Sequence, residues 1–158
     1  MSNVIATDLQ TQEVDSGLVE LFEITLPNGT TMYFHPGLDA DLTDVQFRDR
    51  TSPYSIRDYT AMPMMLDGLD LQADGASSRP ALTIANIGSI LQAELGDYKF
   101  DDLIGERLIR RQTLQKYLVG GSEDASPPVE FPTQQYIIDR VAAEDALSIT
   151  FEVATPFV

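Results

Sequence analysis

Apolar and polar residues alternate along much of the chain, which predicts a protein built mainly from β-strands. A β-branched and aromatic run at 18–26 precedes Pro27-Asn28-Gly29, and a second run follows at 31–34. An Asn-Gly pair between two such runs predicts a hairpin with a type I′ turn, because both residues tolerate the positive φ that this turn needs. Looser alternation predicts strands at 63–74 and 79–85, joined by a turn at 75–78.

The C-terminal part predicts a second hairpin. Its strands are expected at 136–141 and 147–153, with a short turn at 142–146. The run at 147–153 alternates without a fault, which is typical of a half-buried antiparallel strand. Periodicity alone leaves residues 106–118 open between strand and helix.

One short helix interrupts the strands. Ile87, Ile90, Leu91 and Leu95 recur at helical spacing, with Asn86 as a candidate N-cap and Gly96 placed to end the helix. A single further turn is expected at 101–105. These elements predict a mainly β (β+α) fold, an antiparallel β-barrel or sandwich with one helix at about 87–95 and long loops.

The remaining segments read as an arm and loops. Residues 1–16 are polar and patternless, so we expect a mobile N-terminal arm before a single β-rich domain at 17–158. Residues 35–62 predict a long loop with one short strand near 54–59, and 119–132 predicts a second loop. Loops of this length in a compact domain are often functional or ordered by a partner.

Composition narrows the classes of function. The chain contains no Cys, which excludes disulfides and thiolate metal sites, and no apolar run reaches the ~18 residues of a membrane span. Its formal net charge of −15 makes specific nucleic-acid binding unexpected, since such binding needs clustered Lys and Arg.

Charge is also unevenly distributed along the sequence. The first 47 residues contain no Lys or Arg, whereas half of the ten basic residues fall at 99–116. This asymmetry predicts complementary surfaces through which copies or neighbours could stack. An ordinary solvated acidic face is the simpler alternative.

The sequence offers no convincing catalytic constellation. His35 is the only histidine, and no G-x-S-x-G elbow or phosphate-binding loop accompanies it, so a structural role is expected. The basic stretch Arg107–Arg111 lacks the interleaved aromatic residues of a nucleic-acid surface. The pair Met64-Met65 is interpreted as gap-filling core. We therefore expect no enzyme and no cofactor.

Acidic clusters leave one alternative open. Asp39, Asp41 and Thr43 begin like a calcium loop, but Asp44 replaces the required Gly and Arg50 the final Glu. Asp67, Asp70 and Asp74 match no known ligand spacing. A glycan-binding or calcium-dependent β-domain of a virion or cell-surface assembly remains the second reading, and metal analysis with a glycan screen would test it.

An ordered set of short motifs resembles one known family. The segment 66–86 contains a strand, a small polar turn, Ser78-Arg79-Pro80, an alternating Leu-Thr-Ile strand and Asn86. Leu103-Ile104-Gly105, Leu108-Ile109-Arg110-Arg111 and Tyr117-Leu118 follow, and Thr155-Pro156 ends the last strand. Together these resemble the lambda-type minor tail protein L family of long-tailed phages.

The resemblance spans roughly residues 18–156 and favours a strand at 106–118. It points to these family-motif positions as structurally important: Arg79, Pro80, Thr83, Asn86, Gly105, Arg110, Arg111, Thr155 and Pro156. Lambda-type members continue into a Cys-rich region that holds an iron–sulfur cluster, whereas this chain has no Cys. No cluster is therefore expected in it.

The resemblance further implies a structural subunit of the tail tip, assembled in the host cytoplasm. The expected form is a ring, most simply of three copies, that lines the DNA channel. Its expected neighbours are the distal tail protein and the hub or central tip protein. The chain should therefore be found in the virion.

Overall fold

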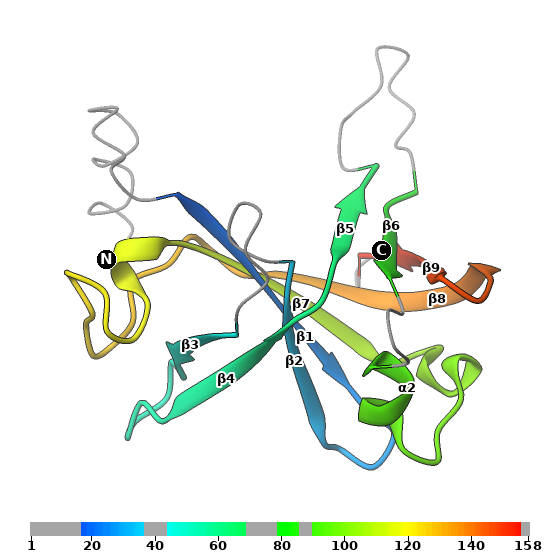
Figure 1. The fold of residues 1–158 in the computed structure, drawn as a ribbon, viewed down its shortest axis with the longest axis horizontal. Coiled ribbons are helices and arrows are strands. Elements are labelled where there is room, and N and C mark those ends of the chain that lie inside the picture. Colours follow the sequence, from blue (N-terminus) through cyan, green and yellow to red (C-terminus); the bar gives the residue numbers. More distant parts are fainter. Residues whose placement is uncertain (1–16, 37–43, 69–78, 86–89, 156–158) are drawn as a thin grey trace. The chain divides into compact units, whose positions relative to one another are not determined.

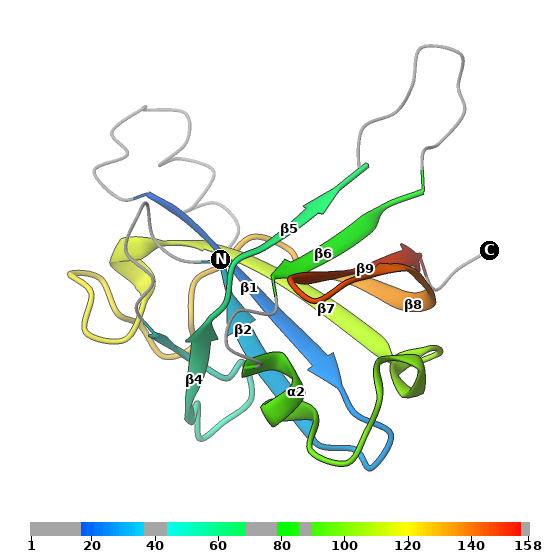
Figure 2. The same ribbon diagram turned by 45° about the vertical axis from the view of Figure 1, so that its right-hand side comes forward.

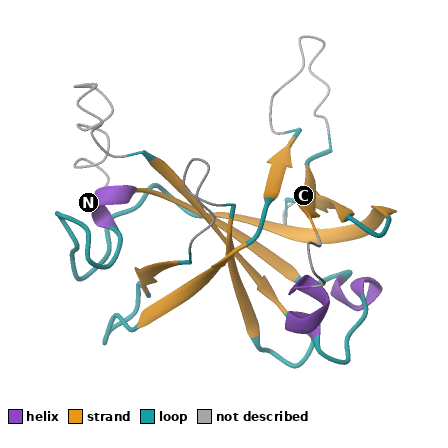
Figure 3. Ribbon diagram, in the orientation of Figure 1, coloured by secondary structure: helices purple, strands orange, loops and turns teal. Residues whose placement is uncertain are grey.

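Strands account for most of the regular structure in the computed structural model, and helix is confined to short segments (Figure 3). The structure describes residues 17–36, 44–68, 79–85 and 90–155. Figure 1 shows the strands and helices in chain order: β1 (Leu18–Thr25), β2 (Thr31–His35), β3 (Val45–Arg48), β4 (Ile56–Ala61), β5 (Met64–Asp67), β6 (Ala81–Ala85), α2 (Ile90–Leu95), η2 (Phe100–Leu103), β7 (Arg107–Leu114), η3 (Gln115–Tyr117), β8 (Gln134–Glu144) and β9 (Ser148–Ala154).

Hydrogen bonds join the described strands in the order β3-β4-β2-β1-β7-β8-β9-β6-β5. The order has two ends, and β2 pairs with β4 in parallel, with Phe34 opposite Thr60. The mainly β prediction is confirmed. The sheet is not the closed, purely antiparallel barrel that was predicted as one form of the fold, because the described strands form one mixed sheet with two ends.

The parallel pair arises inside the segment predicted to be a long loop. Residues 44–61 contain a β3–β4 hairpin, in which Val45 lies opposite Tyr59 and Arg48 opposite Ile56. Tyr54, with φ 57°, turns the chain between the two strands. Because of this hairpin, β4 runs in the same direction as β2 and can pair with it in parallel. The sequence predicted one short strand near 54–59, whereas the segment contains two strands, β3 and β4.

The β1–β2 hairpin is confirmed, but its turn differs from the prediction. Gly29 N–H donates to the Leu26 carbonyl at 2.9 Å, and Gly29 alone in this turn has a positive φ, of 90°. This pattern is a type I turn around Pro27-Asn28 followed by a glycine bulge, rather than type I′. Pro27 explains the change, because its ring fixes φ at the negative value that type I requires.

The described residues group into two compact units, each assembled from separated stretches of chain. Unit 1 takes its residues from Met1–Phe22, Tyr33–Ala61 and Arg110–Gln134, and unit 2 from Glu23–Met32, Met62–Ile109 and Gln135–Val158. The core of unit 1 gathers buried side chains from β1, β3, β4, β7, η3 and the following loop: Val19, Leu21, Val45, Phe47, Tyr59, Leu114, Tyr117, Leu118 and Val129.

The core of unit 2 lies along β6 and β9. Leu82 and Ile84 of β6 are fully buried and lie opposite Phe151 and Ile149 of β9. Figure 2 shows β6, β9 and β8 side by side. Phe100 of η2 meets the Phe151 ring edge-on at 6.5 Å between centroids, so η2 covers this part of the sheet.

The predicted helix is present at Ile90–Leu95, where Leu91 and Leu95 are buried one turn apart. Gly96 ends it with φ 63°, and its N–H donates to the Gln92 carbonyl at 3.2 Å. The predicted N-cap Asn86 and Ile87 lie outside the described residues. The turn expected at 101–105 is present as η2.

The C-terminal half follows the predicted order of elements. The resemblance favoured a strand at 106–118, and residues 107–114 form strand β7, whereas Gln115–Tyr117 form the 3-10 helix η3. Strands β8 and β9 form the predicted hairpin. Strand β8 is longer than the predicted 136–141, and its register against β9 shifts between Ile138 and Arg140 and between Val141 and Ala143. The expected N-terminal arm at 1–16 and the turn at 75–78 lie outside the described residues.

Candidate functional site

The residues with catalytic or metal-binding potential are scattered. His35 is fully buried at the end of β2, and Asp67 is exposed at the end of β5. Asp39, Asp41, Asp70 and Asp74 lie outside the described residues. Across residues 17–36, 44–68, 79–85 and 90–155, no three His, Asp or Glu side chains gather as a metal site would require.

Two small pockets occur on the described surface. One, of about 190 Å³, is lined in unit 2 by Gln92, Lys99, Phe100, Asp101 and Glu144. The other, of about 180 Å³, is lined in unit 1 by Arg50, Pro127, Pro128 and Glu130. Both are smaller than the roughly 300 Å³ at which sites for drug-sized ligands begin.

The most developed polar cluster is an arginine network in unit 1. Arg111 Nε donates to Glu130 Oε1 at 3.0 Å, and its Nη2 donates to Oε2 at 2.7 Å. The Arg111 guanidinium also lies 5.5 Å from the centre of the Phe47 ring, and its Nη1 is 3.4 Å from the Tyr59 hydroxyl. Both charged side chains are almost inaccessible to water, so this pair is part of the core.

A second pair joins the first strand to β7. Arg110 Nε donates to Glu20 Oε2 at 2.9 Å, and Nη1 donates to the Gln134 side-chain oxygen at 3.1 Å. Arg110 and Arg111 therefore point to opposite faces of β7, as successive strand residues do. Each arginine finds its carboxylate on a different segment of unit 1.

The predicted loop at 119–132 is anchored in the same way. Arg48 of β3 donates two hydrogen bonds to the Asp124 carboxylate, at 2.9 and 3.0 Å. Lys116 lies 3.2 Å from Glu123, and Val119 N–H donates to the Gln46 carbonyl at 3.0 Å. The loop thus has a defined conformation against β3.

The contact between Arg48 and Asp124 shifts the pKa values of both groups. The hydrogen bond from Arg48 lowers the pKa of the Asp124 carboxyl, although partial burial opposes this. The same bond raises the pKa of Arg48. Both groups therefore stay charged under ordinary conditions.

The motif positions in unit 2 serve the backbone framework of β6 and its neighbours. Pro80 accepts a hydrogen bond from Val153 N–H at 3.0 Å, and the Thr83 and Thr150 hydroxyls lie 3.1 Å apart across β6 and β9. Gly105 has φ 90°, and its N–H donates to the Ile138 carbonyl at 2.7 Å. Only a glycine adopts that φ without strain.

The other motif positions are dispersed. Arg79 is largely exposed and lies 3.6 Å from Asp139, while Thr155 is exposed. Asn86 and Pro156 lie outside the described residues. The structure brings Pro80 and Thr83 together along β6 and Arg110 and Arg111 together on β7, but it does not gather all nine into one site.

Sequence reasoning missed the acidic partners of the arginines. Glu20, Asp124 and Glu130 had no assigned role, and Glu130 contacts Arg111 across 19 positions. One signal was present: Glu20 occupies a polar position of the strand predicted at 18–26. Nothing in the local pattern indicates which basic residue it meets.

Eight of the ten basic side chains lie within 4.0 Å of a carboxylate oxygen: Arg48, Arg50, Arg57, Arg79, Arg110, Arg111, Lys116 and Arg140. Most of the basic charge at 99–116 is therefore used within the chain. Less unpaired basic charge is therefore left for the contact with a neighbouring copy that the uneven charge distribution predicted.

Together, the fold and these contacts define a mainly β protein whose charged and motif residues hold its own framework in place. No helix among the described residues is long and apolar enough to cross a bilayer. Comparison with known proteins supplies the family. The model of the phage minor tail protein L family matches residues 28–158, and the chain belongs to that family.

A curated relative agrees with this assignment. The tail tip protein L of Escherichia phage lambda is 28% identical over 105 residues, which cover 63% of this chain. The matched region is 44% of the relative, so the chain spans less than half of the length of that protein. Membership of this family makes the chain a phage tail protein with a structural role.

Proposed function

We propose that the chain is a structural subunit of the tail tip of a long-tailed phage. Three copies form a ring that joins the distal tail ring to the hub and receptor-binding assembly and lines the DNA channel. The family match over residues 28–158 carries this proposal. The name of the lambda relative, tail tip protein L, supports the position at the tip.

The internal use of charge supports a structural rather than a catalytic role. In unit 1, Arg48, Arg110 and Arg111 each contact one carboxylate through two guanidinium nitrogens. Such pairs restrict side-chain geometry and specify which segments meet. We expect the purified chain to turn over no substrate.

A closed ring requires two different complementary surfaces on each copy, because its contacts are head-to-tail. The internally paired arginines provide little of that complementarity. Glu20, from the acid-rich first 47 residues, already binds Arg110 within the same chain. The ring contacts are therefore expected to come from other parts of the surface.

The acidic surface fits a channel that DNA must traverse. With a net charge of −15, most exposed charges are carboxylates, which do not release counterions from DNA and so do not retain it. On this proposal the carboxylates face the lumen of the ring. A ring whose acidic residues lie mainly on its outside contradicts this part of the proposal.

Cryo-electron microscopy of intact particles of the phage that encodes this chain tests the assembly. The expected density is a threefold ring at the tail tip, between the distal tail ring and the hub, into which units 1 and 2 fit. Absence of the chain from purified virions contradicts the proposal. So does a position outside the tail tip, or a copy number of six.

A further inference from the structure

The two ends of the sheet differ in how their backbone edges are covered. At the β3 end, Val119 N–H donates to the Gln46 carbonyl, and Arg48 holds Asp124 of the same loop. The loop therefore satisfies an outward-facing backbone group of β3. Covering an edge in this way prevents it from pairing with another chain.

At the β5 end, the described residues provide no such cover. β5 pairs with β6 alone, with Met65 opposite Thr83 and Leu66 opposite Leu82. Ala85 N–H donates to the Pro63 carbonyl at 2.8 Å, so Pro63 and Ala85 form a hydrogen-bonded pair of the ladder and Met64 and Ile84 form a non-hydrogen-bonded pair. Because bonded and non-bonded pairs alternate in an antiparallel ladder, the N–H and C=O groups of Met64 and Leu66 point away from β6.

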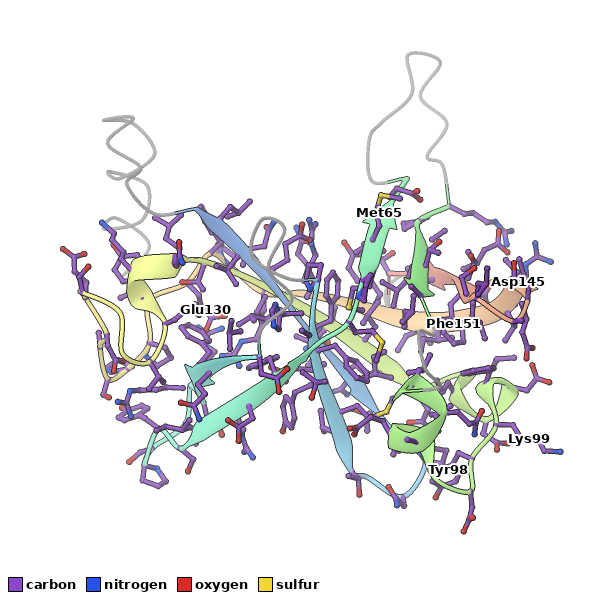
Figure 4. All side chains as sticks on the ribbon, viewed as in Figure 1. Met65, Tyr98, Lys99, Glu130, Asp145 and Phe151 are labelled. Atoms are coloured by element: carbon purple, nitrogen blue, oxygen red, sulfur yellow. The ribbon has the colours of Figure 1, made fainter. Side chains whose placement is uncertain are left out.

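The side chains beside this edge form a small anchoring surface. Met65, labelled in Figure 4, is 59% exposed, so the interpretation of Met65 as core is wrong. Leu66, on the other face of the strand, is buried. Asp67 is exposed two positions later, on the same face as Met65. Within the part of the chain that the structure describes, the edge thus presents backbone groups without a strand partner, one flexible apolar side chain and one carboxylate.

Charge selects among possible occupants of this edge. A second copy of the chain carries the same net charge of −15, and among the described residues only Lys99 and Arg107 lack a carboxylate within 4.0 Å. Self-pairing therefore brings together two acidic surfaces. An extended segment with Lys or Arg side chains combines backbone pairing with electrostatic attraction.

We infer that β5 is a docking edge for a Lys- or Arg-bearing β-strand contributed by a different protein of the tail. This inference rests on the proposed function, since it names the chemistry of a neighbour in the assembly. The incoming strand bonds to the backbone of Met64 and Leu66. One of its apolar side chains packs on Met65, and a cationic side chain lies near Asp67.

The full chain is titrated with two synthetic ten-residue peptides, one alternating Val and Lys and the other alternating Val and Glu. Backbone amide shifts and amide hydrogen exchange are followed by NMR. The Val-Lys peptide is expected to shift β5 and β6 signals and to protect the Met64 and Leu66 amides. The Val-Glu peptide is expected to do neither.

Two proline variants form a matched pair for the backbone contact. Met64→Pro removes an N–H that points to the open edge and leaves the bonds between β5 and β6 in place. Gln46→Pro removes an outward N–H at the covered β3 edge. Met64→Pro is expected to weaken Val-Lys binding about tenfold, or about 1.4 kcal/mol, and Gln46→Pro to leave it unchanged. Met65→Lys, which keeps the backbone intact, is expected to weaken it through like charge.

Five results overturn the inference. They are no binding of the Val-Lys peptide, shifts spread over the whole surface, equal binding of both peptides, Val-Lys binding that is unaffected by both Met64→Pro and Met65→Lys, and a β5-to-β5 dimer in sedimentation equilibrium. None of them concerns the place of the chain in the virion, which microscopy tests separately.

Discussion

Arg111 and Glu130 form a doubly hydrogen-bonded ion pair in unit 1 that is almost completely withdrawn from water. Their side chains are 6% and 3% exposed, and Glu130, labelled in Figure 4, belongs to the loop that follows η3. A buried pair of this kind gains Coulomb energy but loses the hydration of both charges. Its main effect is to specify that β7 and the 129–131 segment meet in one register.

Removal of one partner should therefore be far more damaging than removal of both. Glu130→Gln leaves the buried Arg111 charge without its counter-charge and should lower the free energy of unfolding by about 3–5 kcal/mol. Arg111→Met leaves Glu130 with the largely exposed Arg50, 4.0 Å away, as its remaining cation, and should be comparably destabilising. The double variant Arg111→Met/Glu130→Leu should recover most of that loss. Urea denaturation followed by circular dichroism measures all three.

The exposed pair Arg79–Asp139 provides the matched control. Its side chains are 72% and 54% exposed, so Asp139→Asn should change the free energy of unfolding by less than about 1 kcal/mol. If the double variant at Arg111 and Glu130 proves less stable than either single variant, the pair is a net source of stability rather than of specificity.

Acid should release the loop that Arg48 holds. Asp124 has a pKa below the ordinary value of an aspartate because it accepts hydrogen bonds from Arg48. The unfolded chain then takes up the proton first, so the stability from this group is present above the ordinary carboxyl pKa. It is lost as the pH falls through the lowered one.

Asp124→Asn should accordingly lower Tm at neutral pH, and its difference from the wild type should shrink as the pH falls through that window. Thermal unfolding at a series of pH values measures the effect. Arg48→Met/Asp124→Asn should behave like Asp124→Asn alone. A difference that grows in acid would contradict the lowered pKa.

Sequence pattern predicted the local elements well and their partners poorly. Alternation at 147–153 and the Asn28-Gly29 turn depend on neighbouring residues, and both hairpins are present in the structure. The parallel pairing of β2 with β4 depends on residues about 26 positions apart, such as Phe34 and Thr60. Period two along a strand carries no information about which strand lies next to it.

The same limit applies to the charged positions. Arg110 and Arg111 were singled out by resemblance. The sequence gives no sign that Arg110 contacts Glu20, which lies 90 positions earlier in the chain. Met65 was misassigned because an edge strand and a central strand have the same composition over four residues. Its exposure depends on the sheet ending at β5, which only tertiary structure determines.

Close backbone packing makes Gly121 sensitive to substitution. A Cβ at this position would lie 2.8 Å from the Lys116 carbonyl carbon and 2.9 Å from the Gln115 oxygen, and neither backbone atom can move cheaply. Gly121→Ala should lower the free energy of unfolding by about 1–3 kcal/mol. Gly17→Ala, which would meet nothing within 4 Å, is the control and should be neutral or slightly stabilising. Equal effects in urea denaturation would exclude crowding at Gly121.

The turn between β8 and β9 should depend on a single carboxylate oxygen. Asp145 Oδ1 accepts hydrogen bonds from the N–H groups of Leu147 and Ser148, both at 2.8 Å, and these bonds lower the pKa of Asp145 (Figure 4). Asp145→Ala removes the acceptor, so amide exchange at Leu147 and Ser148 should become faster while the β6–β9 ladder stays protected. Asp145→Asn keeps an oxygen acceptor and should retain most of the protection.

Because the pKa of Asp145 is lowered, the wild-type turn should loosen only below the ordinary carboxyl pKa, whereas the Asn variant should show no such transition. Hydrogen exchange that is unchanged in Asp145→Ala would mean that strand pairing alone holds the turn.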